Sequence, residues 1–115
     1  MQSCLMTIVV CAALPAVAMA WPCQTVHGRM YLANGTPSVR IWIVGTTRLL
    51  GVLQQDQRFD DLPRNIRTTW AAHGDEWSSY LFGNFRVCPI ERDRPGWMRL
   101  VNVVGGAALR VRPIY

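Results

Sequence analysis

The stretch Thr25–Val44, TVHGRMYLANGTPSVRIWIV, decides the fold because apolar and polar residues alternate on both sides of a turn signal. Such period-two alternation is typical of half-buried β-strands. The turn Asn34-Gly35-Thr36-Pro37 combines residues that tolerate positive φ with a proline of fixed φ. The stretch therefore predicts a β-hairpin with Ala33 opposite Ser38 and one apolar side, made of Val26, Met30, Leu32, Val39, Ile41 and Ile43.

The rest of the chain predicts further short strands and one helix. The helix is expected at 63–72, with a proline in its first turn and Ile66 and Trp70 spaced for one buried side. Strands are expected at 48–53, 77–88, 97–104 and 107–111, the last one following Gly105-Gly106, with loops at 54–62 and 89–95. The fold class is mainly β: a small antiparallel β-sandwich or an OB-like barrel of five to six strands with one short helix.

The first twenty residues differ from the rest and predict an N-terminal signal peptide. Between Cys4 and Trp21 no side chain is charged, and Ala18-Met19-Ala20 places small residues where a signal peptidase reads them. We expect cleavage after Ala20, which gives a leader at 1–20 and a single β-rich domain at 21–115. The N-terminal region has no lysine or arginine, which is unusual for such a leader.

Two other interpretations of this segment are weaker. A transmembrane anchor needs about 20 apolar residues, and Pro15 interrupts a stretch that barely reaches that length. A lipoprotein signal would end in a cysteine after small residues, which neither Cys11 nor Cys23 satisfies. We therefore expect a periplasmic or secreted protein without stable membrane insertion after cleavage.

The mature domain keeps two cysteines, Cys23 and Cys88. In an oxidising compartment such a pair is expected to form a disulfide. Closing a loop of this length stabilises a fold by about 4 kcal/mol in the chain-entropy model. A metal site made of the two thiols and a histidine is the less favoured alternative.

The formal net charge of +5 comes from twelve basic residues, all arginine, against seven acidic ones. Arginine can bind anions with its bidentate fork, although a codon bias towards GC-rich triplets explains the absence of lysine more simply. The positive charge lies entirely in the mature domain and is spread along its sequence. It predicts weak attraction to anionic surfaces.

The hairpin register places four larger side chains together on the side away from the core. Tyr31 falls opposite Arg40, and Arg29 falls opposite Trp42. Facing side chains in a sheet lie about 5 Å apart, within reach of cation–π contact. The hypothetical binding site for a glycan, an anionic polymer or a partner strand is therefore made of Arg29, Tyr31, Arg40 and Trp42. The alternative is a solvent face that cation–π pairs merely stiffen, or a face that the helix covers.

No pattern in the chain predicts catalysis, a cofactor or a metal. His73-Gly74-Asp75-Glu76 could supply metal ligands, but polar glycine-containing loops of this kind are common. Asp60-Asp61 and Asp75-Glu76 are adjacent carboxylates, which are usually solvated, and no serine stands in a nucleophile elbow. Asn34-Gly35-Thr36 matches the glycosylation acceptor pattern but also fits ordinary turn chemistry. We expect no enzyme and no cofactor.

Four segments of the chain resemble parts of carboxypeptidase-regulatory-like, transthyretin-type β-sandwich modules. They are Gly28-Arg29, Ala33-Asn34-Gly35-Thr36-Pro37, Gly45-Thr46 and the later Gly83-Asn84-Phe85-Arg86-Val87. The likeness covers about 25 residues. The segment from Pro37 to Gly45 is shorter than in that family, and the distance from Gly45 to Gly83 is longer. Those modules are accessory domains without catalysis, so the resemblance implies binding or scaffolding.

Together these observations predict an exported, small, non-enzymatic binding or structural module of the cell envelope. An envelope protein or an anionic polymer is the expected partner, and no nucleic acid is expected. An OB-like binder of oligosaccharide or nucleic acid is the first alternative, and a small hydrolase is the second. The oligomeric state is left open.

Overall fold

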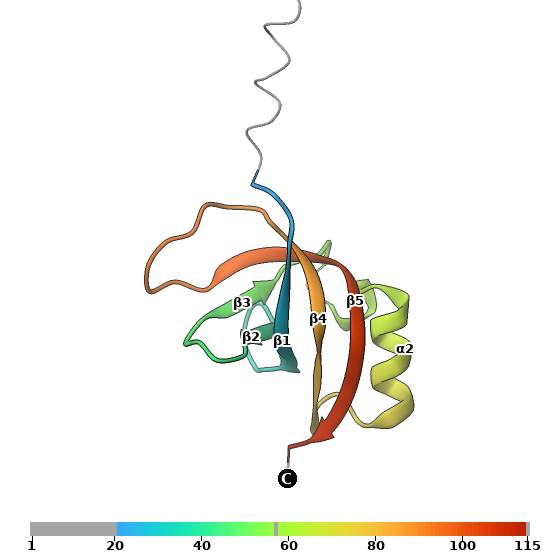
Figure 1. Ribbon diagram of the computed structural model, residues 1–115. Coiled ribbons are helices and arrows are strands. Elements are labelled where there is room, and N and C mark those ends of the chain that lie inside the picture. Colours follow the sequence, from blue (N-terminus) through green and yellow to red (C-terminus); the bar gives the residue numbers. More distant parts are fainter. Residues whose placement is uncertain (1–20, 57, 115) are drawn as a thin grey trace, which may run out of the picture.

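A computed structural model of the chain describes residues 21–56 and 58–114 (Figure 1). The predicted leader at 1–20 lies outside the described residues. The elements are, in chain order, β1 (Gln24–Leu32), β2 (Val39–Ile43), β3 (Leu49–Val52), the 3-10 helix η2 (Phe59–Asp61), α2 (Arg64–His73), β4 (Ser79–Pro89) and β5 (Arg99–Pro113). The prediction of a small, mainly β fold with one α-helix is therefore confirmed for the described part of the chain.

The first hairpin forms with the predicted register. Arg29 pairs with Trp42 and Tyr31 pairs with Arg40. The backbone N–H of Ala33 donates to the carbonyl of Ser38 at 2.8 Å, which closes the hairpin. Gly35 has a φ of 107° in the turn, a conformation that glycine adopts without steric cost.

The five strands form one mixed sheet that closes into a barrel in the order β1-β2-β3-β5-β4. All pairings are antiparallel except that of β3 with β5. A parallel pairing requires a crossover connection, and here the chain between β3 and β5 runs through α2 and β4. β1 closes the ring by pairing with β4 over Gln24–Met30.

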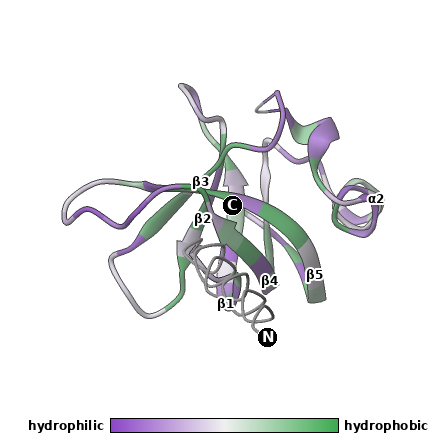
Figure 2. Ribbon diagram, turned by 90° about the horizontal axis from the view of Figure 1, so that it is seen from above, coloured by the Kyte–Doolittle hydropathy of each residue, from purple (hydrophilic) through white to green (hydrophobic). Residues whose placement is uncertain are grey.

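The core fills the barrel and continues under the helix. Met30, Ile41, Leu81 and Phe85 are fully buried and come from the inward positions of β1, β2 and β4. Ile66 and Trp70, one helical turn apart on α2, are also fully buried, as their spacing predicted. In Figures 1 and 2, α2 lies beside β5 and away from β1 and β2.

The C-terminal part of the chain differs from the prediction of two short strands. β5 is one strand of 15 residues, and Gly105-Gly106 lies inside it. A Cβ on Gly106 would stand 3.0 Å from Cγ1 of Ile66, so this glycine lets α2 approach the strand. Two register irregularities in the pairing with β4 and a positive φ of 53° at Ala108 bend β5 without ending it.

Cys23 and Cys88 form the predicted disulfide, which joins the residue just before β1 to β4. The bond links positions 65 residues apart in the sequence. Within the described residues, no helix is long and apolar enough to cross a membrane.

Candidate binding face

The outer surface of β1, β2, β4 and β5 carries two rows of arginine and aromatic side chains. Strand pairing aligns the first row across the sheet as Trp42, Arg29, Phe82 and Arg110. The second row places Arg40 opposite Tyr31 and Tyr80 opposite Arg112, and the rings of Tyr31 and Tyr80 are 6.3 Å apart. We call this surface the arginine–aromatic face, made of Arg29, Tyr31, Arg40, Trp42, Tyr80, Phe82, Arg110 and Arg112.

Arg29 is the centre of this face. Its guanidinium carbon lies 4.1 Å from the ring centre of Tyr80, 4.8 Å from that of Trp42 and 5.6 Å from that of Tyr31. The Nε atom of Arg29 is buried and has no hydrogen-bond partner among the described residues. Each cation–π contact stabilises by about 0.5–1 kcal/mol at exposed sites. The rings therefore hold a positive charge in place without neutralising it.

Hydrogen bonds to neighbouring turns fix the two side chains contributed by β2. Arg40 donates from Nε to the carbonyl of Pro37 at 3.1 Å, in the turn after β1. Trp42 donates from Nε1 to the carbonyl of Thr46 at 2.7 Å, in the turn after β2. Both side chains stay half-buried, so the two turns hold them in a fixed position at the surface.

The charges are unevenly distributed in the fold. None of the five strands contains an aspartate or a glutamate. The seven acidic residues lie in η2 and in the connecting segments: Asp56, Asp60, Asp61, Asp75, Glu76, Glu91 and Asp93. The strands instead carry Arg29, Arg40, Arg86, Arg99, Arg110 and Arg112. The barrel wall is therefore positively charged.

The close ion pairs of the described residues all use arginines outside the strands. The ion pairs are Arg48–Asp93, Arg58–Asp60 and Arg94–Glu91. No strand arginine forms an ion pair with a carboxylate in the described part of the chain. Within the described residues, no carboxylate therefore neutralises the arginines of the arginine–aromatic face by a close ion pair.

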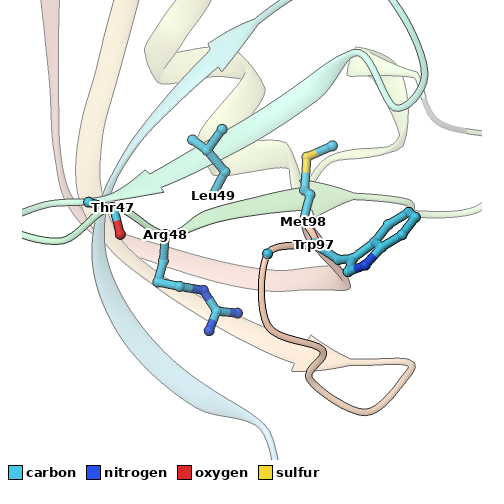
Figure 3. A pocket seen from close by; sticks show the side chains of 6 residues that line it. Thr47, Arg48, Leu49, Trp97 and Met98 are labelled. Carbon is cyan, nitrogen blue, oxygen red and sulfur yellow. The ribbon is translucent and has the colours of Figure 1, made fainter.

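A hollow of about 370 Å³ opens at the β3 end of the first row (Figure 3). Leu49 lines it and pairs with Trp42, so the hollow continues the row beyond β2. Trp97 and Met98, from the segment between β4 and β5, line the other side. The side chain of Trp97 is 64% exposed, and the guanidinium of Arg94 lies 4.8 Å from its ring centre.

The ion pair of Arg48 with Asp93 holds the β4–β5 segment beside this hollow. Two hydrogen bonds of 2.8 and 2.7 Å join the guanidinium to the carboxylate. They lower the pKa of Asp93 below its ordinary value and raise the pKa of Arg48. Because a lowered carboxyl pKa favours the charged form, the pair is present at neutral pH and is lost in acid as Asp93 is protonated.

The two histidines lie apart from each other on the surface. Nδ1 of His27 lies 3.0 Å from Oδ1 of Asn84, beside the arginine–aromatic face. Nδ1 of His73 lies 3.0 Å from the carbonyl of Thr69, and the residue lines a hollow between α2 and β5 together with Arg110 and Arg112. No group of three or more metal-ligating side chains occurs among residues 21–56 and 58–114.

The four residues predicted from the sequence do come together, and strand pairing adds four that the sequence did not suggest. Tyr80, Phe82, Arg110 and Arg112 join the site because β1 pairs with β4, and β4 pairs with β5. The helix packs against β5, so it is not what covers the hairpin. Comparisons of the chain with protein-family models, curated proteins and solved structures found no significant match.

Proposed function

We propose that the mature chain is an exported, non-enzymatic module of the cell envelope that binds an anionic polymer on its arginine–aromatic face. The observation that carries this proposal is the separation of charge. The wall of the barrel has arginines and no acidic residue, while all seven carboxylates stand in connecting segments or in η2. An extended positive surface with half-buried rings suits a ligand that offers both negative charge and flat faces.

The strand order supports an OB-like barrel over a sandwich. A five-stranded barrel with a helix between the third and fourth strands and a parallel contact between the third and fifth agrees with that architecture. OB-type barrels bind oligosaccharides or oligonucleotides on strands two and three and on the neighbouring loops. Trp42, Leu49 and Trp97 lie in the corresponding region here. The resemblance to transthyretin-type modules stays a prediction.

Export is supported by the disulfide between Cys23 and Cys88, because such bonds persist in oxidising compartments. A polymer of the envelope is then a more accessible ligand than a nucleic acid.

The test compares two variants that lose the same charge. The face variant carries Arg40→Gln, Arg110→Gln and Arg112→Gln, and the control variant carries Arg58→Gln, Arg64→Gln and Arg92→Gln. Binding of residues 21–115 to heparin, as a general polyanion, is measured by isothermal titration calorimetry. We expect the face variant to bind about 3- to 150-fold more weakly, since three charge contacts at the surface contribute about 0.2–1 kcal/mol each.

Equal losses in the two variants would mean that net charge alone attracts the polymer, and would contradict a specific face. If heparin does not bind and an envelope protein co-purifies with the domain, the protein-binding alternative takes the place of this proposal.

A further inference from the structure

The first row of the arginine–aromatic face alternates ring and charge in the direction across the strands. In that direction the order is Trp42, Arg29, Phe82, Arg110. Along β1 and β2 a ring and an arginine also follow one another, as Arg29 and Tyr31 and as Arg40 and Trp42, but that alternation ends after one pair. β4 presents Tyr80, Phe82 and Asn84, and β5 presents Arg110 and Arg112. Only a ligand that lies across the strands therefore meets two rings and two arginines in turn.

We infer that this ligand is an acidic polysaccharide that crosses the strands and carries its negative charge on alternate sugars. The inference rests on the proposed function and names its ligand class. Neighbouring strands are about 4.8 Å apart, so the backbone positions of Arg29 and Arg110, which are separated by β4, are about 10 Å apart. Phe82, which lies between them, offers a ring to the sugar that carries no charge.

Arg29 is already positioned for such a ligand. Three rings hold its guanidinium, and its Nε has no partner among the described residues. The side chain therefore loses little conformational freedom when an anion binds, and preorganisation of this kind favours affinity.

The hollow beside β3 extends the same line. Leu49 continues the first row past Trp42, and the exposed ring of Trp97 stands across the hollow from β3. A chain that crosses β5, β4, β1 and β2 thus reaches another aromatic ring at its end. Apolar and aromatic surface at regular intervals suits sugar rings, which present flat C–H faces.

Single-stranded nucleic acid fits this spacing less well. Each nucleotide of a single strand contributes one phosphate, so every unit of that polymer carries a charge. In the first row, by contrast, an uncharged aromatic position separates the two arginines.

The experiment compares ligands with equal numbers of charges. A hyaluronan octasaccharide and a tetragalacturonide each carry four carboxylates, on alternate sugars in the first and on every sugar in the second. A single-stranded DNA of five nucleotides carries four phosphates, and an uncharged octasaccharide controls for ring contact alone. We expect the hyaluronan octasaccharide to bind residues 21–115 at least 10-fold more tightly than each of the other three.

Variants test the path of the chain. Arg110→Gln and Phe82→Leu are each expected to weaken binding of the hyaluronan octasaccharide about 2- to 5-fold, and Arg64→Gln, on α2, is expected to leave it unchanged. Equal or tighter binding of the tetragalacturonide or the DNA would overturn the inference. If heparin binds but the oligomers bind equally well, the inference about the polysaccharide is wrong and the proposed function stands. If no polyanion binds, both the inference and the proposed function are wrong.

Discussion

Replacing Trp70 with alanine is expected to lower the free energy of unfolding by about 3–5 kcal/mol, the range for buried aromatic residues. Trp70 is fully buried, and its ring centre lies 5.6 Å from that of Phe59. Its Nε1 donates to Oγ of the buried Ser79 at 2.9 Å, and Ser79 donates to the carbonyl of Asp75 at 2.6 Å. The substitution leaves a cavity between α2 and the barrel. It also removes the indole N–H that donates a hydrogen bond to Oγ of Ser79.

The measurement is urea denaturation of residues 21–115 followed by far-UV circular dichroism. Trp77→Ala is the matched control, because Trp77 is 56% exposed and is expected to change the unfolding free energy by less than about 0.5 kcal/mol. A loss of similar size in both variants would contradict the assignment of α2 to the core.

Removing the disulfide with Cys23→Ser and Cys88→Ser is expected to cost about 4 kcal/mol of unfolding free energy. The bond closes a loop of 65 residues that contains β1 to β3, α2 and most of β4. Its loss enlarges the conformational freedom of the unfolded chain. Since small domains are stable by about 5–15 kcal/mol, the variant should melt well below the oxidised protein.

Reduction of the unmodified protein provides the second arm of this experiment. With excess dithiothreitol, the unmodified protein should unfold at the same urea midpoint as the double serine variant. Without dithiothreitol, the unmodified protein should unfold at a higher urea midpoint than that variant. If the serine variant unfolds at the same urea concentration as the oxidised protein, the bond contributes no stability and this prediction is wrong.

Much of the fold could be predicted from local patterns. The alternation in Thr25–Val44 was sufficient to predict the hairpin register. The spacing of Ile66 and Trp70 was sufficient to predict the buried side of the helix. The glycine pair at 105–106 was misleading, because its role depends on a distant contact. Gly106 lies inside β5 where Ile66 of α2 comes close, and no local pattern indicates that approach.

Half of the arginine–aromatic face could also be predicted, because Arg29, Tyr31, Arg40 and Trp42 belong to one hairpin. The other half depends on which distant strand pairs with β1, and local periodicity does not specify that pairing. One signal was nevertheless present in the sequence. The predicted strands contain no acidic residue, and this could have identified the barrel wall as a positive surface despite the even spread of charge along the chain.

The central claim is that the arginines of the arginine–aromatic face bind a polyanion, and the salt dependence of heparin binding tests it most directly. The logarithm of the binding constant should fall linearly with the logarithm of the NaCl concentration, by about 0.7–0.9 for each neutralised charge. The face variant, with Arg40→Gln, Arg110→Gln and Arg112→Gln, should therefore show a salt-dependence slope smaller in magnitude by about 2–3. The control variant, with Arg58→Gln, Arg64→Gln and Arg92→Gln, should show the same slope as the unmodified protein. Equal slopes for all three proteins, or an affinity that does not depend on salt, would contradict the claim.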